Sequence, residues 1–162
     1  MIEFERELRA LAGQLSPHLQ RCLFYVDESN SYVLFNRYVI SRLGEHHCAH
    51  RYGDDRTVLF NSLKNATVWC ILDNENKFYE ARRVSELDAL LMSAQMDKLI
   101  HSRLSKRGDA SDRAINAAKL QHDSDKERLF QTELNKYTIL ARDCQQRRFE
   151  HETNRTGRKQ KN

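Results

Sequence analysis

The chain has few residues that interrupt regular structure. Its 162 residues include a single proline, Pro17, and only five glycines. Proline removes a backbone donor and breaks helices, so its absence after residue 17 leaves the rest of the chain free to form long ones. The one clear break in the second half is Gly108-Asp109.

Long apolar runs are also missing. The longest, residues 67–72, is far shorter than the roughly 20 residues that cross a bilayer. The N-terminal sequence MIEFEREL is charged from its third residue, unlike a signal peptide. We therefore expect no membrane partner and a cytoplasmic location. Hydrophobic residues make up 40% and charged residues 31% of the chain, which favours a folded domain over a disordered one.

Cysteines are few and widely spaced. None of the four forms a CxxC pair, so we expect reduced thiols that pack as small apolar side chains: Cys22, Cys48, Cys70 and Cys144. The segment 46–50 has the residue types of a metal site, and in a strand His46, Cys48 and His50 would share one face. A fourth ligand is not evident, and a histidine-rich exposed strand is the alternative. We predict no metal site.

Signatures of catalysis and of cofactor binding are absent. The chain has no GxGxxG motif, no GxxxxGK[ST] phosphate loop and no nucleophile elbow. Asp54 and Asp55 are adjacent carboxylates, but they follow Gly53 in a sequence typical of a turn. We therefore expect no enzyme activity, no cofactor and no small-molecule substrate.

Positive charge is concentrated at the C-terminal end. Residues 147–162 contain six basic and two acidic side chains, which accounts for the whole net charge of +4. Such a segment can neutralise phosphates in a manner independent of sequence, although many basic tails serve only solubility. The candidate nucleic-acid contacts are Arg147, Arg148, Arg155, Arg158, Lys159 and Lys161.

The first half of the chain indicates a small antiparallel sheet with helices. Residues 2–15 have apolar residues near helical spacing, and Pro17 ends that helix. Aromatic and β-branched residues gather over 20–61, where we predict strands near 20–26, 32–42, 46–52 and 56–61 joined by tight turns. One such turn is expected over 27–31. Ser62 is a good N-cap for a helix over 63–72.

The second half predicts a helical hairpin. Helices are expected over about 77–107 and 111–152, with Ser111 as the cap of the second, and the Gly-Asp break should turn the chain back on itself. In the second helix, Phe130 to Cys144 repeat at heptad spacing. We expect these helices to present the protein interface: Met92, Met96, Leu99, Phe130, Leu134, Tyr137, Ala141 and Cys144. The methionine row could instead be the inner face of the hairpin.

One segment carries a resemblance. The sequences NSLKNATVWCILD (61–73) and NKFYEARRVSELD (76–88) resemble small uncharacterised proteins of large tailed bacteriophages, over about residues 55–90. The resemblance implies a phage context, and with it a virion-associated or infection-accessory role and a virion location. It carries over no functional residue.

These observations predict an α+β fold: a small antiparallel β-meander with an N-terminal helix, followed by a long antiparallel α-helical hairpin. The expected divisions are a head over 1–76, a hairpin over 77–152 and a disordered basic tail over 153–162. The expected function is a non-enzymatic structural or interaction protein that binds a protein partner, or itself, through the hairpin. The alternative is an accessory protein that binds nucleic acid through the tail.

Overall fold

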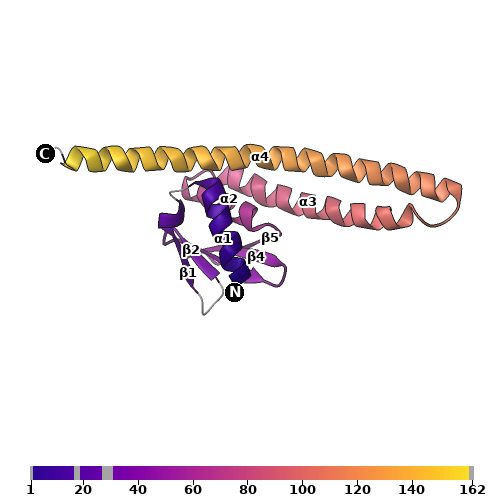
Figure 1. The fold of residues 1–162 in the computed structure, drawn as a ribbon, viewed down its shortest axis with the longest axis horizontal. Helices are drawn as coiled ribbons and strands as arrows, with labels where there is room; N and C mark the ends of the chain where they lie inside the picture. Colours follow the sequence, from indigo (N-terminus) through magenta and orange to yellow (C-terminus); the bar gives the residue numbers. More distant parts are fainter. Residues whose placement is uncertain (1, 17–18, 27–30, 161–162) are drawn as a thin grey trace.

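A computed structural model describes residues 2–16, 19–26 and 31–160 of the chain and confirms the predicted α+β fold (Figure 1). Among these residues, a head of two α-helices, a short 3-10 helix and five strands leads into two long helices that form an antiparallel hairpin. In chain order the elements are α1 (Ile2–Leu15), η1 (Leu19–Cys22), β1 (Leu23–Val26), β2 (Ser31–Leu34), β3 (Tyr38–Leu43), β4 (His46–Arg51), β5 (Thr57–Phe60), α2 (Leu63–Asn74), α3 (Phe78–Leu104) and α4 (Ala110–Gln160).

The strands form a single meander in the order β1-β2-β3-β4-β5, and every neighbouring pair is antiparallel. Two predictions here differ from the structure: residues 20–22 of the strand expected over 20–26 belong to η1, and the strand expected over 32–42 is two strands. Phe35 and Asn36 both have positive φ angles, 58° and 53°, and turn the chain between β2 and β3. The turn expected over 27–31 lies, except for Ser31, outside the described residues.

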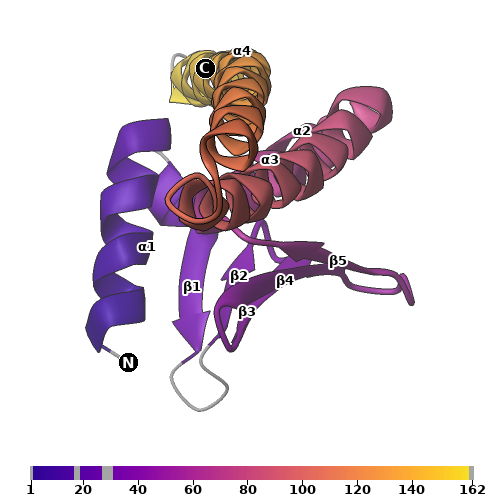
Figure 2. The ribbon, with the colours of Figure 1, turned by 90° about the vertical axis from the view of Figure 1, so that its right-hand side faces the viewer.

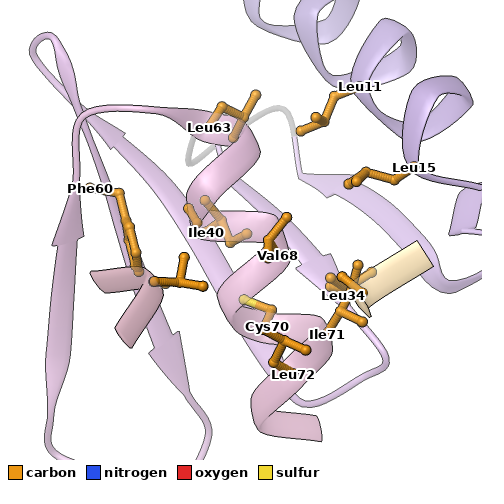
Figure 3. Close-up of a cluster of buried hydrophobic side chains, with 14 of the residues drawn as sticks. Leu11, Leu15, Leu34, Ile40, Phe60, Leu63, Val68, Cys70, Ile71 and Leu72 are labelled. Atoms are coloured by element: carbon orange, nitrogen blue, oxygen red, sulfur yellow. The ribbon is translucent and has the colours of Figure 1, made fainter. Parts of the chain in front are cut away.

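All the helices lie on one face of the sheet, as Figure 2 shows. The buried apolar side chains of β2, β3, β4 and β5 point to this face and pack against α1 and α2 in the main core (Figure 3). Phe4 of α1 contacts the rings of Tyr25, Tyr32 and His47 at centroid distances of 5.9–6.1 Å. In the part of the chain that the structure describes, no helix lies over the opposite face of the sheet.

The base of the hairpin belongs to the same core as the head. Side chains from α3 and α4, such as Val84, Leu87 and Leu134, are buried in one cluster with α2 and the sheet. Asp88 is buried as well, and its carboxylate accepts hydrogen bonds from the Asn61 backbone and the Asn65 side chain, both at 2.8 Å. This aspartate fixes α3 to the junction between β5 and α2. The boundary expected at residue 76 therefore falls between two helices, while the head and the base of the hairpin share one hydrophobic core.

The capping residues are partly those expected from sequence. Ser62 caps α2, since its hydroxyl accepts a hydrogen bond from the Asn65 backbone at 3.3 Å. At the hairpin turn Gly108 has a φ of +85°, which favours glycine. The cap of α4 was expected at Ser111, but Asp109 fills this role by accepting from the Asp112 backbone at 2.8 Å.

Helix α4 is longer than expected. It continues to Gln160 and spans 51 residues, about 77 Å at 1.5 Å per residue. Disorder was predicted from residue 153, and this is wrong for residues 153–160, which continue the helix. Residues 161 and 162 lie outside the described part. No helix among the described residues is long and apolar enough to cross a membrane.

Candidate interaction surface on the helical hairpin

The heptad row of α4 is a buried seam inside the molecule. Leu134, Ala141 and Cys144 are at most 7% exposed, and Phe130 and Tyr137 pack against the same core. Burial also raises the pKa of the Cys144 thiol. From sequence these five residues were expected at an interface with another molecule, and this is wrong: α4 crosses over α2 and α3, so the seam is covered by the chain itself.

Beyond Ala94 the contact between the two helices becomes polar. We define the arm as residues 95–129, the part of the hairpin that projects away from the head (Figure 1). The residues that face α4 from α3 here are Lys98 and His101, not leucines. Lys98 donates to Glu127 at 3.1 Å, and the His101 ring nitrogen lies 2.5 Å from a carboxylate oxygen of Asp123. Asp123 is only 4% exposed, although aspartate is rarely buried unless it is paired.

Apolar side chains of the arm instead point outward. Met96, Leu99, Ile100 and Leu104 are 41–51% exposed, while the polar residues Lys98 and His101 occupy the inner side. The arm is therefore reversed relative to an ordinary helical hairpin, whose apolar side chains pack between its helices. From sequence, the methionine row could have been the inner face of the hairpin. The exposure of Met96 and Leu99 shows that these two residues do not form that face. Met92 is half-buried at the base of the arm.

The exposed row extends along the whole of α3. Eight positions at alternating spacings of four and three residues form a second seam, which we name the outer seam. It begins beside the head and ends near the tip, and all of its members are exposed or half-buried: Phe78, Arg82, Ser85, Ala89, Met92, Met96, Leu99 and Arg103. A heptad spacing on an open helix face is the pattern of a coiled-coil seam.

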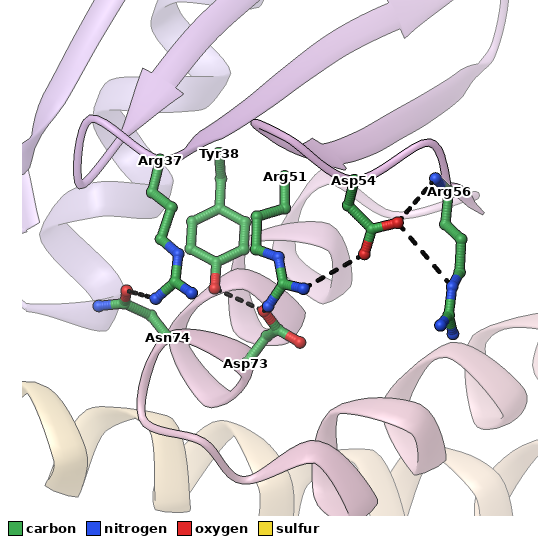
Figure 4. A network of polar contacts seen from close by, with 7 residues as sticks. All are labelled: Arg37, Tyr38, Arg51, Asp54, Arg56, Asp73 and Asn74. Carbon is green, nitrogen blue, oxygen red and sulfur yellow. Dashed lines mark hydrogen bonds and ion pairs between the residues drawn. The ribbon is translucent and has the colours of Figure 1, made fainter.

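A cleft with both polar and apolar lining residues lies beside the head end of the outer seam. It has a volume of about 630 Å³ and is lined by residues of the β4–β5 turn, α2 and α3, among them Trp69, Phe78 and Arg82. Arg51, Asp54 and Asp73 of its lining belong to a network in which Tyr38 donates to Asp73 at 2.5 Å and Arg51 pairs with both Asp54 and Asp73 (Figure 4). The contacts of Asp54 with Arg51 and with the backbone of Arg56 fit the turn role expected from sequence. Asp55 is exposed.

The pKa shifts of Tyr38 and Asp54 stabilise the contacts of this network. Burial, and then the hydrogen bond to Asp73, raise the pKa of Tyr38 above its usual value. The backbone N–H of Arg56 lowers the pKa of Asp54 below its usual value. Tyr38 therefore stays protonated as a donor, and Asp54 stays charged as the partner of Arg51. The network ties the β4–β5 turn to the end of α2.

Three residues of the histidine-rich strand β4 have side chains of the types that ligate metals. His46, Cys48 and His50 do share one face of β4, as predicted, and it is the face without helices. His46 lies 2.8 Å from Asn61 and His50 contacts the Tyr52 ring. Within residues 2–16, 19–26 and 31–160, no three histidine, cysteine or carboxylate side chains are grouped for metal binding.

The basic residues near the C-terminus have different surroundings. Arg148 is held against the head, where its guanidinium lies 5.2 Å from the Phe35 ring centroid and 3.5 Å from Glu75. Arg147 and Arg155 are exposed on α4. Arg158 and Lys159 fall in the last turns of the helix, and Lys161 lies outside the described residues.

Comparison with known proteins returns no relative: no family model, curated protein or solved structure matches this chain. The phage resemblance stays a prediction.

Two features of the surface were not evident from the sequence alone. The polar pairs of the arm were visible only as a gap in the apolar pattern of α4 between Leu120 and Phe130, and that gap gave no sign of its partners on α3. The outer seam was seen in part, as Met92, Met96 and Leu99. Its head half, residues 78–89, has mixed chemistry and shows its spacing only once the opposite face of α3 is known to be buried.

Proposed function

We propose that this protein is a non-enzymatic interaction protein that binds a protein partner through the outer seam of α3. The observation that carries the proposal is the reversal of the arm. Its buried side is polar, whereas Met96 and Leu99 of the outer seam lie exposed, with Ile100 and Leu104 exposed beside the seam. Exposed apolar side chains that form a continuous row are typical of binding surfaces.

The shape of the molecule supports the same proposal. The base of the hairpin is fixed in the core by Asp88 and by the pair of Arg83 with Glu133, in which two nitrogens donate at 3.0 and 3.2 Å. The arm is thus held away from the head on a rigid base. A row of side chains presented in this way suits the recognition of another helix along its length. A virion-associated role in a phage, implied by the resemblance, fits such a protein and remains part of the proposal.

An affinity capture from the native cell extract tests this function. The full chain is compared with the Met96→Glu variant, which places a charge in the seam at a site 51% exposed. We expect proteins, or further copies of the chain, that the wild type retains and the variant does not. The Leu129→Glu variant is the matched control, since Leu129 is 64% exposed on α4 and outside the seam. Identical captured sets for all three chains would contradict the proposal.

A second function is supported by a separate observation. Helix α4 projects beyond the head at its C-terminal end (Figure 1), and it carries Arg155, Arg158 and Lys159 there on a helix rather than on a loose tail. We propose nucleic-acid contact through this end as the alternative. Arg148 is excluded from the contact set, because it is already occupied by Glu75 and Phe35.

A further inference from the structure

The outer seam of α3 is complementary to itself. We propose that its partner is a second copy of the chain, with the two α3 helices antiparallel across a twofold axis. This inference rests on the proposed function and names the partner. A twofold axis makes every contact occur twice, so a seam must match its own reversed sequence to form such a dimer.

The match appears when the axis passes beside residue 94. Met92 then lies opposite Met96 of the second copy, and Ala89 lies opposite Leu99 of the second copy. Large side chains face small ones in the second of these pairs, which lets the layers interdigitate. The four apolar positions from Ala89 to Leu99 thus contact one another only, while Ser85 and Arg103 meet at both ends of this apolar segment and Phe78 lies outside it.

Charge favours the same antiparallel arrangement. Arg103 pairs with no carboxylate in the part of the chain that the structure describes. Glu86 is next to Ser85 and pairs with Arg82 and Arg83 of its own helix at 3.4 Å, while its side chain is still 47% exposed. In the antiparallel dimer Arg103 of the second copy reaches Glu86 from the open side and shares its carboxylate, and the symmetry repeats this contact. In a parallel dimer Arg103 would face its own copy, which is repulsive.

The length of the paired segment determines how tightly the dimer is expected to bind. Residues 85–103 span about 27 Å of helix at 1.5 Å per residue. Two helices in contact over this length bury less than the roughly 800 Å² per partner of a standard interface. We therefore expect a reversible dimer with a dissociation constant in the micromolar range. The axis lies toward the arm, so the two heads are placed at opposite ends of the paired segment.

Sedimentation equilibrium of the purified full chain tests the dimer. Over a concentration series across the micromolar range, the mean mass should rise from that of one chain to that of two. Met96→Glu would place a charge in each half of the contact and should weaken the dimer by at least about 100-fold. Leu129→Glu should leave the dissociation constant unchanged. Both sites are exposed, and circular dichroism confirms that each variant is folded.

Disulfide trapping tests the register. Ala89→Cys and Leu99→Cys chains are oxidised separately and as a mixture, beside the wild type, which controls for the four native cysteines. The antiparallel register predicts a covalent dimer that forms in the mixture and in neither chain alone. A dimer formed by either single variant, or none in the mixture, would overturn it.

The outcomes separate the two proposals. A wild-type chain that stays monomeric through the series, while cell extracts yield a protein that Met96→Glu fails to retain, overturns the self-association and leaves the proposed function standing. A monomeric chain with no such protein overturns both.

Discussion

Leu134 and Ile139 show how differently two apolar residues of one helix can be placed. Leu134 is 2% exposed in the core beneath α4, whereas Ile139 is 55% exposed. We expect Leu134→Ala to lower the free energy of unfolding by about 2–5 kcal/mol, because it removes buried methyl groups and leaves a cavity. Urea denaturation measures the change.

The matched control is Ile139→Ala, which should alter the free energy of unfolding by about 0.5 kcal/mol or less. If Leu134→Ala were equally mild, the seam of α4 would not lie in the core. It would then be available to another molecule, as its heptad spacing first suggested.

His47 gives the head a dependence on pH. The residue is 7% exposed, its ring stacks on Phe4, and its Nδ1 has no partner among the described residues. Burial lowers the pKa of His47 below its ordinary value of 6.5, and nearby Arg42 adds to the effect. The charges of Glu7 and Asp88 act on the pKa in the opposite direction, and that of His46 adds to the lowering.

Because the folded-state pKa lies below the unfolded value, the unfolded chain binds more protons as the pH falls through 6.5. The stability that His47 contributes is therefore complete above this pH and is lost below it. Thermal unfolding at pH 7.5 and 5.5, compared for wild type and His47→Leu, measures the effect. The variant should lose less stability on acidification, whereas His151→Leu, at an exposed site, should behave as the wild type. Equal losses in the wild type and His47→Leu would show that His47 is not the group responsible.

At the scale of elements, the hairpin has two halves of different character. The base is held by apolar side chains such as Leu87 and Leu91, while the arm is held by the Lys98–Glu127 and His101–Asp123 pairs. A partly exposed pair such as Lys98–Glu127 stabilises a helix contact only weakly, and the arm has few buried apolar contacts to add to it. We expect backbone amides of the arm to exchange with solvent faster than those of the base, as measured by hydrogen exchange with mass spectrometry.

The internal comparison for this experiment is α4 itself, since residues 115–129 and 133–147 belong to one continuous helix. Faster exchange in the first segment would reflect the contacts rather than helix length. Uniform protection along α4 would contradict the prediction for a dilute monomeric chain. Higher concentration should slow exchange in α3 if the proposed dimer forms.

The elements that sequence reasoning found are those with local signals. Ser62 and Gly108 mark a helix start and a turn by their own chemistry, and both do so in the structure. The break between β2 and β3 lacks such a signal, because Phe35 adopts a positive φ that bulky residues rarely accept. Its ring packs against the core, and Arg148, 113 positions later, covers it. That contact depends on the folded chain and leaves no local trace.

At the scale of the whole molecule, the candidate site was only partly predictable, because it too depends on contacts between distant parts of the chain. The heptad spacing of residues 130–144 correctly indicated a seam, but spacing alone does not say whether the chain or another molecule covers it. The path of α4 over α2 decides this. The full outer seam of α3 can be identified only when the buried face of that helix is known, because the seam is the heptad row that remains exposed.

The helical C-terminal end leads to the last prediction. If Arg155, Arg158, Lys159 and Lys161 contact phosphates, the logarithm of the binding constant for a short DNA duplex should fall linearly with the logarithm of salt concentration. Changing these four residues to glutamine should weaken binding and reduce that slope by up to about 3.6, at about 0.9 for each phosphate that is no longer neutralised. Fluorescence anisotropy at several salt concentrations measures both quantities.

A second variant provides the control, with glutamine at four exposed basic positions elsewhere on α4: Lys119, Lys126, Lys136 and Arg142. Both variants remove the same charge, so a specific contact predicts that only the first reduces the slope. Equal reductions would mean that any attraction to DNA comes from the overall charge of the protein, and no change in either would exclude this end of α4 as a nucleic-acid surface.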